Sequence, residues 1–418
     1  MEKNKKVLVV GSGGREHAIV KALARSPRVS EIYCAPGNAG ISQDATCVDI
    51  KVEDVEGLLN FAQRHNIDLT VVGPEASLAA GVADAFNRLG MKVFGPSKSA
   101  TRIESSKEFA KQIMEKYGVP TSAYRSFEDF NSALQYVKSR PLPAVIKYDG
   151  LAAGKGVVIA ATYEEAENAL KDMLLDESFG KGKVVIEDFL EGPEFSFMCL
   201  VNGDKVYPLE LAQDHKRAFD GDEGPNTGGM GAYSPVPFIS PETREKALKE
   251  IMEPTAAAMV AEGVPFTGVL YGGLILTADG PKVIEFNARF GDPETEVVLP
   301  RLESDFYSFL EAVMEGKDYI PQWSEDAVLG IVLASKGYPG KYEKGAVING
   351  LEKLGGEVYH MGTRKEDGKF KVAGGRVLMV TSRGEDLVAA NMNARKEIAL
   401  IECPALFHRT DIGKAVLK

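Results

Sequence analysis

Short apolar runs alternate with segments of helical periodicity over the first hundred residues. The run at residues 7–10 ends at Gly11, and the apolar positions after it recur every three to four residues. The alternation predicts strands at 7–10, 31–35, 69–72 and 92–94 and helices at 15–25, 54–65 and 78–89. Strands separated by single helices are typical of a parallel, doubly wound sheet. Its ligand should lie outside the carboxyl ends of the strands, where three glycine-bearing loops occur (11–14, 35–38 and 73–75).

A different pattern begins after residue 104. One apolar stripe predicts a helix over 105–117. A small α+β unit follows, and the helix expected over 163–174 starts with Thr162 and Glu165, which fit a capping box. The strands of this unit are predicted at 144–148, 157–161 and 184–189, and those of a larger unit at 195–201, 270–277 and 282–287.

These changes predict an α/β protein of three domains. The first, over 1–104, is a Rossmann-like domain with the doubly wound parallel sheet. The second, over 105–318, is a two-part α+β domain in which about 121–190 form a smaller, mobile part. A linker around Trp323 leads to a small C-terminal α/β domain over 325–418, with strands at 328–334 and 375–380 and a helix at 387–401.

Composition narrows the class of protein. The chain has 418 residues and a net charge of −11, which disfavours nucleic acid and anionic membranes as partners. No apolar run is long enough for a secretory signal or a membrane helix. Four scattered cysteines without a C-x-x-C pair are typical of the reducing cytoplasm. The 43 glycines are more than average and gather in loops that adjoin lysine or arginine, which indicates small-molecule ligands. We expect a monomer or a weak homo-oligomer.

Two glycine-rich loops are candidates for binding phosphate. The turn Gly11-Ser12-Gly13-Gly14-Arg15-Glu16 offers backbone N–H groups at a helix N-terminus, but Glu16 replaces the last glycine of a dinucleotide fingerprint. The second loop spans 147–156 and places one lysine at a strand end and another among glycines. Phosphate needs such cations and an accessible backbone. A plain tight turn and a flexible hairpin are the alternatives, and the loop at 180–183 is predicted to be mobile.

The strand at 283–290 carries the most specific signal. Alternate side chains share one face, so Glu285, Asn287 and Arg289 point the same way. A carboxylate and an amide oxygen suit Mg²⁺, which leaves its other positions to phosphates and water. Arg289 suits a bidentate grip on a carboxylate or an acyl-phosphate. The alternative is a half-buried strand with a polar solvent face.

Two further segments are weaker candidates. The turn at 187–194 could hold a purine edge through Glu187 and ribose hydroxyls through Glu194. Lys216 and Arg217 precede a glycine-dense loop at 221–231 and could form another anion site. Taken alone, each is equally consistent with solvated surface charge.

Together these features resemble the ATP-grasp ligases. Four motifs in order narrow the resemblance to the phosphoribosylamine–glycine ligases of purine synthesis: Gly-Ser-Gly-Gly-Arg-Glu-His-Ala, Asp-His-Lys-Arg, Gly-Pro-Asn-Thr-Gly-Gly-Met-Gly-Ala and Arg-Phe-Gly-Asp-Pro-Glu-Thr. The resemblance spans essentially the whole chain and is to the monofunctional form. Glu296 departs from the expected Gln, and we expect it to add negative charge near the metal site.

The resemblance implies that ATP drives the joining of glycine to 5-phosphoribosylamine through a glycyl-phosphate, with Mg²⁺ or Mn²⁺ bound by Glu285 and Asn287. The implied ATP-binding residues are Lys107, Lys147, Lys155, Glu187, Phe189, Leu190 and Glu194. The residues implied for phosphoribosylamine and glycine are Gly13, Gly14, Arg15, Asn38, Glu75, Lys216, Arg217 and Arg289. The implied catalytic residues are Arg289, Lys155 and Asp292.

The chemistry fits this residue inventory. Attack of a carboxylate on a phosphoryl group needs positioning and charge neutralisation, and no protein nucleophile. A closing lid would keep water away from an acyl-phosphate. The alternatives are another ATP-grasp ligase or carboxylase of purine synthesis and a non-catalytic nucleotide-binding regulator. A nicotinamide dehydrogenase is disfavoured by Glu16.

Overall fold

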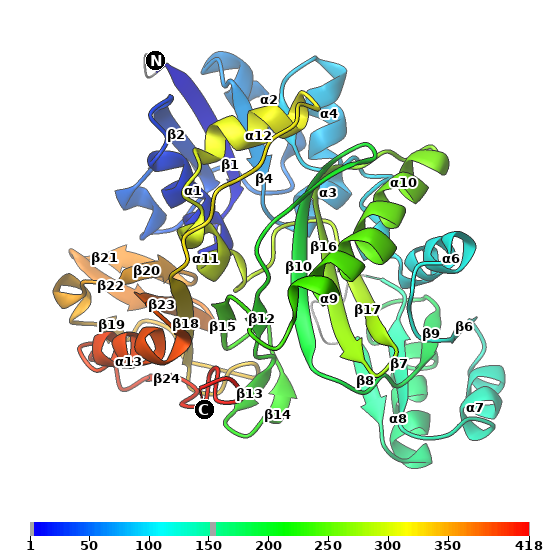
Figure 1. Ribbon diagram of the computed structural model, residues 1–418. Helices are drawn as coiled ribbons and strands as arrows, with labels where there is room; N and C mark the ends of the chain where they lie inside the picture. Colours follow the sequence, from blue (N-terminus) through cyan, green and yellow to red (C-terminus); the bar gives the residue numbers. More distant parts are fainter. Residues whose placement is uncertain (1–3, 151–155, 418) are drawn as a thin grey trace.

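A parallel sheet forms the N-terminal part of the computed structural model, which describes residues 4–150 and 156–417. Its strand order is β3-β2-β1-β4-β5, and every pairing is parallel. The strands are β1 (Lys5–Gly11), β2 (Val29–Pro36), β3 (Thr46–Cys47), β4 (Leu69–Val72) and β5 (Val93–Phe94). Helices α1 (Gly14–Ala24) and α2 (Val55–Arg64) connect them (Figure 1). The predicted doubly wound sheet is confirmed, and its carboxyl-end loops face the rest of the molecule.

One helix predicted in the N-terminal part is interrupted in the structure. The segment expected as a single helix over 78–89 forms α3 (Glu75–Ala80) and α4 (Val82–Arg88). Gly81 separates them with a φ of +91°, a left-handed conformation that only glycine adopts without strain. Helix α3 also starts earlier than predicted, at Glu75, directly after the loop that follows β4.

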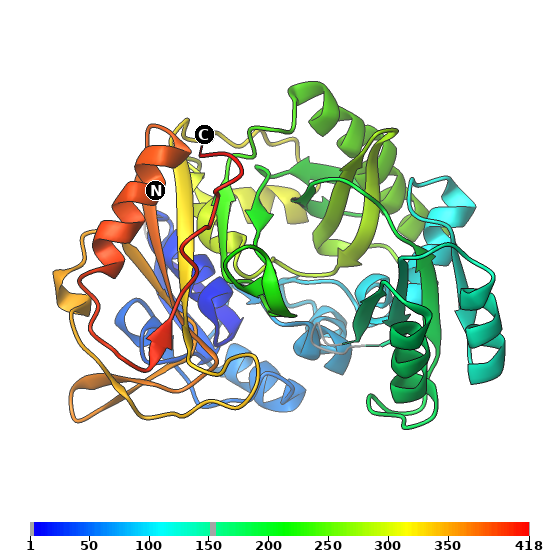
Figure 2. The ribbon, with the colours of Figure 1, turned by 90° about the horizontal axis from the view of Figure 1, so that it is seen from below.

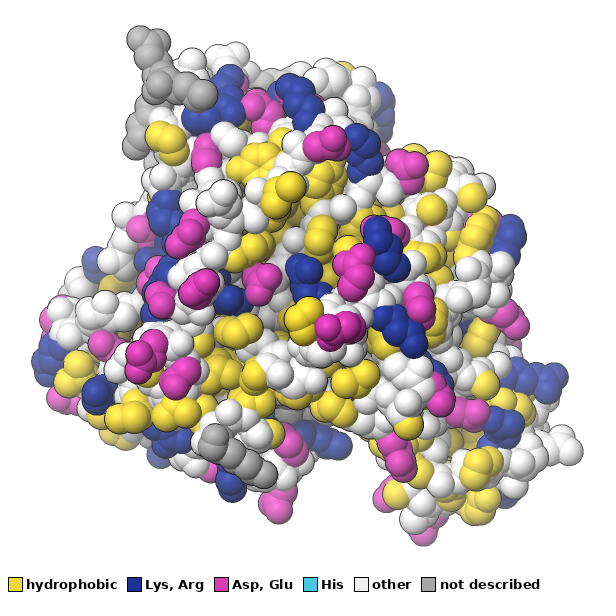
Figure 3. Space-filling model, viewed as in Figure 1, with side chains coloured by type: hydrophobic (Ala, Val, Ile, Leu, Met, Phe, Trp, Pro, Cys, Tyr) yellow, Lys and Arg dark blue, Asp and Glu magenta, His cyan; other side chains and the backbone are white. Residues whose placement is uncertain are grey.

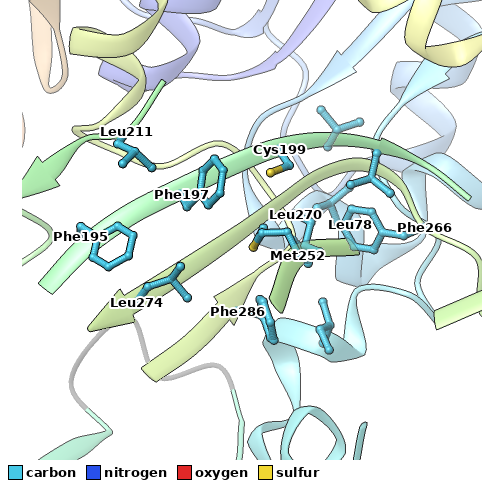
Figure 4. Packing of buried hydrophobic residues seen from close by; sticks show 14 of the residues in the cluster. Leu78, Phe195, Phe197, Cys199, Leu211, Met252, Phe266, Leu270, Leu274 and Phe286 are labelled. Carbon is cyan, nitrogen blue, oxygen red and sulfur yellow. The ribbon is translucent and has the colours of Figure 1, made fainter. Parts of the chain in front are cut away.

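An antiparallel sheet forms the centre of the molecule. Its order is β11-β10-β16-β17, with β10 (Glu194–Asn202), β11 (Lys205–Pro208), β16 (Thr267–Thr277) and β17 (Gly280–Asn287). Apolar side chains on one face, such as Phe197, Leu270 and Phe286, pack together with Met252 (Figure 4). The covering helices are α6 (Lys107–Tyr117), α9 (Pro241–Ala247), the π-helical turn η2 (Leu248–Met252) and α10 (Glu253–Ala261). This packing holds β17 rigidly at the edge of the sheet.

A smaller sheet lies beside the central one and has the order β6-β9-β7-β8. Helix α8 (Tyr163–Leu174) has the predicted bounds, and Thr162 and Glu165 form the predicted capping box. The other elements are β6 (Tyr124–Phe127), α7 (Phe130–Lys138), β7 (Ala144–Tyr148), β8 (Val157–Ala160) and β9 (Val184–Asp188). These elements have a core of their own and form a separate lobe, best seen in Figure 2.

The C-terminal sheet extends beyond the segment expected to form it. Its order is β12-β15-β18-β23-β20, with β24 (Leu406–Phe407) also pairing with β18. Two of its strands, β12 (Gln213–Asp214) and β15 (Gly231–Ser234), come from residues before 325. The others are β18 (Ala327–Ser335), β20 (Glu357–His360) and β23 (Arg376–Gly384), and α13 (Leu387–Ile398) packs on β18 and β23. Strands β12 and β15 flank the segment that carries Lys216. This segment is therefore held by the C-terminal sheet, although it precedes residue 325.

Short elements complete the described chain. The hairpin of β13 (Arg217–Phe219) and β14 (Glu223–Asn226) lies near the C-terminus, and α5 (Arg102–Ser105) precedes α6. Helices α11 (Thr295–Val298) and α12 (Phe306–Met314) follow β17. A third small sheet joins β19 (Val347–Ile348), β22 (Lys369–Val372) and β21 (Thr363–Glu366). Among the described residues, no helix is both long and apolar enough to cross a membrane.

Candidate active site

Strand β17 presents the residues predicted to bind a metal. Glu285 lies opposite Gly273 and Asn287 opposite Tyr271 in the antiparallel pairing with β16. Because the two residues are separated by one position, both side chains leave the same face of the strand. Arg289 follows the strand end, and its Nη2 lies 3.4 Å from Asn287 Oδ1. The structure therefore brings these three side chains together, as their spacing predicts.

Cations surround the Glu285 carboxylate. Loss of water around it would raise its pKa, but attraction to Lys216, Lys147, Lys107 and Arg289 outweighs this and lowers the pKa. Within the described part of the chain, no side chain or backbone group makes a hydrogen bond to this carboxylate. Nor do those residues contain a cluster of three or more His, Cys, Asp or Glu able to hold a metal. The donor set fits a hard cation that takes its other ligands from a bound phosphate.

Arg289 joins the central strand to the N-terminal part of the molecule. Its Nε lies 3.3 Å from Glu75 Oε2 at the start of α3, and its Nη2 lies 3.4 Å from Glu104 Oε1 in α5. Although burial opposes the charge of Arg289, Glu104 and Glu75 raise its pKa. Glu104 also accepts the backbone N–H of Ala288 at 2.8 Å. Glu75 was predicted at this site, and Glu104 was missed.

Two predicted ATP lysines approach the same strand from different elements. Lys147, at the end of β7, donates to the carbonyl of Ile284 at 2.8 Å. Lys107, at the start of α6, donates to the carbonyl of Gly150 at 3.0 Å, and burial lowers its pKa. Both ammonium groups also attract Glu285. Lys155, the third predicted phosphate-binding lysine, lies outside the described residues.

Glu187 does not present a free carboxylate for a purine edge, so that interpretation of its side chain is wrong. The group is buried and lies 2.8 Å from Lys147 Nζ and 2.9 Å from Lys111 Nζ. Ser122 Oγ also donates to it at 2.8 Å. Burial would raise the pKa of Glu187, but the two lysines lower it. The Glu187 carboxylate is engaged because the two buried ammonium groups need its negative charge as a counterion.

The segment after Glu187 contacts the site through Glu194. The Phe189 side chain is 38% exposed, and Leu190 next to it is half-buried. Glu194, at the start of β10, is 3.0 Å from Lys216 Nζ. Although loss of water opposes the charge of Lys216, attraction to Asp214, Glu194 and Glu285 raises its pKa well above the usual value.

Arg217 faces away from this group of residues. Its guanidinium donates to the carbonyl of Gly224 at 2.8 Å within the β13–β14 hairpin, and its own carbonyl accepts from Arg409 at 3.0 Å. Figure 3 shows the indentation between this hairpin and the lobe of β6 to β9. The two adjacent cations of the motif therefore have different surroundings.

The turn before α1 is more acidic than predicted. Glu16 is buried; its Oε2 accepts the Gly13 N–H at 2.7 Å, and its Oε1 pairs with Arg15 Nε at 2.6 Å. The expected anion cradle is thus neutralised within the protein. Asn38 is likewise engaged: its amide donates to the carbonyls of Ser12 and His360 and accepts two backbone N–H groups.

Two more carboxyl groups lie against this turn. Asp292 Oδ1 is 2.9 Å from Arg376 Nη1 of β23. Glu296 in α11 is fully buried and lies so close to Gly14 that any side chain at Gly14 would collide with it. Burial, reinforced by repulsion from Asp292, raises the pKa of Glu296 well above its usual value. The neutral carboxyl is therefore favoured, and the expected extra negative charge near the metal site is not supported.

Two residues near the site gave no signal in the sequence, and a third was quoted in a motif without a role. Lys111 is one of three lysines in an amphipathic helix, and Glu104 is one acidic residue among several. Asp214 belongs to the Asp-His-Lys-Arg motif, but its attraction to Lys216 depends on folding; loss of water raises the pKa of Asp214 to about 7. The assembled site combines an oxygen-bearing strand, several cations and an arginine beside two carboxylates. It can neutralise a polyphosphate and hold a small carboxylate.

Comparison with known proteins assigns the three parts of the chain to one family. Models of the phosphoribosylglycinamide synthetase N domain, ATP-grasp (A) domain and C domain match residues 5–104, 105–295 and 328–415. A phosphoribosylamine–glycine ligase from Halalkalibacterium halodurans is 53% identical over 98% of this chain and 97% of its own length. One from Listeria monocytogenes is 54% identical over 97% and 99%. The crystal structure of the Thermotoga maritima phosphoribosylamine–glycine ligase superposes with a TM-score of 0.87 at 35% identity, covering 97% of this chain and 100% of that one.

Proposed function

The chain belongs to the phosphoribosylglycinamide synthetase family, and from this premise we propose how its own residues carry out the ligation. It is an ADP-forming carbon–nitrogen ligase that joins glycine to 5-phosphoribosylamine in purine biosynthesis. ATP is its co-substrate, in keeping with its ATP-grasp domain. Two relatives that match over nearly their whole length are named phosphoribosylamine–glycine ligases. Neither name supports the alternatives of a carboxylase or a non-catalytic regulator.

The first proposed step forms a glycyl-phosphate. A carboxylate oxygen of glycine attacks the γ-phosphorus of ATP, the bond from that phosphorus to the β–γ bridging oxygen breaks, and ADP leaves. Lys107 and Lys147 neutralise phosphate charge, while Arg289 holds the glycine carboxylate. Lys155 is assigned to the phosphates by the family resemblance. Phe189, Leu190 and Glu194 line the adenosine end; the backbone of the strand end at Glu187, rather than its side chain, faces the base.

The second proposed step forms the amide. The amine of phosphoribosylamine attacks the glycyl carbonyl carbon, the bond from that carbon to the phosphate oxygen breaks, inorganic phosphate leaves, and the nitrogen gives up one proton to solvent. We assign the phosphate of this substrate to Lys216, and not to Arg217, whose guanidinium is bonded within the β13–β14 hairpin. We assign the ribosyl part to the turn at Gly13, Gly14 and Arg15, which Asn38 braces; the Glu16 carboxylate of this turn is the group that can accept hydroxyl or amine protons. Asp292 lies beside that turn, in a position to orient the amine.

Glu285 and Asn287 are the residues proposed to hold Mg²⁺ or Mn²⁺. Their oxygen atoms share a face of β17, and the Glu285 carboxylate has no hydrogen-bond partner among the residues that the structure describes. When bound, the ion would add positive charge at the ATP phosphates. The four free cysteines fit our proposal that the enzyme works in the reducing cytoplasm. We also propose that it is a monomer or a weak homo-oligomer.

One observation carries the proposed route: Arg289 lies at the end of the strand whose Glu285 is surrounded by cations. This places a carboxylate grip next to a phosphate-neutralising group. The test uses glycine labelled with ¹⁸O in its carboxyl group, in a single turnover with ATP and phosphoribosylamine. Because the attacking oxygen leaves with the phosphate, released phosphate should carry one labelled oxygen. Unlabelled phosphate would exclude the glycyl-phosphate.

A further inference from the structure

Three buried charges form a cluster behind the nucleotide side of the site. The Glu187 carboxylate lies between Lys147, at 2.8 Å from Oε1, and Lys111, at 2.9 Å from Oε2. The side chains of all three are less than 5% exposed. Lys147 and Glu187 come from neighbouring strands β7 and β9, whereas Lys111 comes from α6. One negative charge therefore serves two positive charges. Burial lowers the pKa of Lys111 to about 8, so at pH 7 the cluster has a net charge of +1.

The surroundings of Lys111 hold it in one position. Its ammonium donates at 2.8 Å to Thr121 Oγ1 and at 2.8 Å to Ser122 Oγ. Thr121 in turn donates to the carbonyl of Val283 at 2.8 Å, and Lys147 donates to the carbonyl of Ile284 next along β17. Both lysines are thereby fastened to the strand that carries Glu285. A buried ammonium with this many fixed partners has little freedom to pair elsewhere.

We propose that Lys111 is a positioning residue of the nucleotide site: it shares the Glu187 carboxylate, so that Lys147 keeps uncompensated positive charge for the ATP phosphates. This inference rests on the proposed function, in which Lys147 contacts ATP. Without Lys111, Glu187 would pair with Lys147 alone and cancel its charge. A buried ion pair is weak evidence of a purely stabilising role, because apolar side chains of similar volume often stabilise as well.

The net charge of Lys111, Lys147 and Glu187 determines how strongly this cluster attracts the ATP phosphates. Interactions between charges a few ångströms apart are strong where water is excluded, so one unit of charge near the phosphates changes the affinity for ATP considerably. Removing Lys111 lowers the net charge of the cluster from +1 to 0. Removing Glu187 as well restores +1 without restoring the original contacts. A charge effect and a packing effect therefore give opposite results in the double variant.

The test measures equilibrium binding of a non-hydrolysable ATP analogue with Mg²⁺, together with steady-state kinetics, on the full chain. Lys111→Met should raise the Kd and the KM for ATP by about tenfold or more, with a smaller effect on the KM for glycine. Lys111→Arg keeps the charge and should stay within about threefold of the unaltered enzyme. Lys116→Met is the matched control, because Lys116 lies on the same helix, is exposed and pairs with Glu262. It should bind ATP normally.

The decisive variant combines Lys111→Met with Glu187→Gln. We expect it to recover most of the lost ATP affinity, because Lys147 regains its free charge. Affinity as low as that of Lys111→Met, or lower, would overturn the proposal, and so would normal affinity in Lys111→Met itself. Lys147→Met distinguishes an error in the assignment of Lys147 to ATP from an error in the role of Lys111. If it leaves ATP binding unchanged, the assignment of Lys147 to ATP is wrong; if it weakens binding while Lys111→Met does not, only the role of Lys111 is wrong.

Discussion

Arg289 Nε lies 3.3 Å from Glu75 Oε2, which links the end of strand β17 to the first turn of helix α3. The Glu104 carboxylate lies on the other side of the same guanidinium. Burial raises the pKa of Glu104, whereas that of Glu75 is lowered: burial would raise it, but Arg289 and Arg15 outweigh this. Glu75 is thus the more readily ionised of the two carboxyl groups, although Glu104 exerts the larger attraction on Arg289. A substrate carboxylate at Arg289 must take the place of part of this ion pair.

Arg289→Lys should therefore weaken glycine binding more than ATP binding. A lysine keeps the charge but cannot make the bidentate contact, so we expect the KM for glycine to rise about 10- to 100-fold. Steady-state kinetics at saturating ATP checks this. Arg244→Lys serves as the control, since Arg244 is half-buried and bonds to the carbonyl of Leu209. An unchanged KM for glycine would remove Arg289 from the carboxylate site.

Local sequence patterns predicted those parts of the fold that local interactions determine. Thr162 Oγ1 accepts the Glu165 N–H at 3.1 Å, and this cap, readable from four residues, fixes the start of α8. The alternation of short apolar runs and single helices likewise predicted the parallel sheet. Glu285 and Asn287 share a face because strand geometry alone requires it.

Other features depend on contacts between distant segments. Lys111 and Glu187 are 76 positions apart, and neither is distinguishable from an ordinary surface charge before folding brings them together. The addition of β15 to the C-terminal sheet also pairs segments about 100 residues apart, such as Gly231 with Ile331. Backbone pairing of this kind leaves no periodic signal. The fold was therefore more predictable than the partners of individual charged residues.

Glu285→Gln should reduce turnover by several orders of magnitude while the protein remains folded. The amide keeps the shape but removes the negative charge that four cations attract and that the proposed metal requires. Initial rates over a wide range of Mg²⁺ concentration provide the measurement, with the fold checked by circular dichroism. Near-normal rates at ordinary Mg²⁺ would exclude Glu285 as a metal ligand. Glu250→Gln, on the exposed face of η2, is the control.

Buried histidines should make the protein less stable at mildly acidic pH. Burial lowers the pKa of His360 to about 3, and the unfolded chain has a value of about 6.5. Between these values the unfolded state binds more protons, so stability falls as the pH drops below about 6.5, by up to about 1.4 kcal/mol per pH unit. Urea denaturation at pH 7.5 and pH 5.5 should show a smaller loss for His360→Gln than for the unaltered protein. His65→Gln, at an exposed position, should show the full loss.

Glu296→Gln should stabilise the protein, and more so at higher pH. The raised pKa of Glu296 means that the folded state retains a proton that the unfolded state loses above about pH 4.5, so this residue reduces stability as the pH rises toward its folded-state pKa. Neither carboxyl oxygen has a hydrogen-bond partner in the described part of the chain. An amide has the same shape and no proton to lose, so we expect a gain of about 1–3 kcal/mol at pH 8 and little at pH 5.

Denaturant midpoints for Glu296→Gln at the two pH values measure the gain, and the Mg²⁺ dependence of the rate provides an independent comparison. Because the neutral carboxyl carries no charge, replacing it should leave the Mg²⁺ requirement unchanged. A stability gain over the unaltered protein that is the same at both pH values would show that the pKa of Glu296 is not raised in the folded protein. A lower Mg²⁺ requirement would show that its charge reaches the Glu285 site after all.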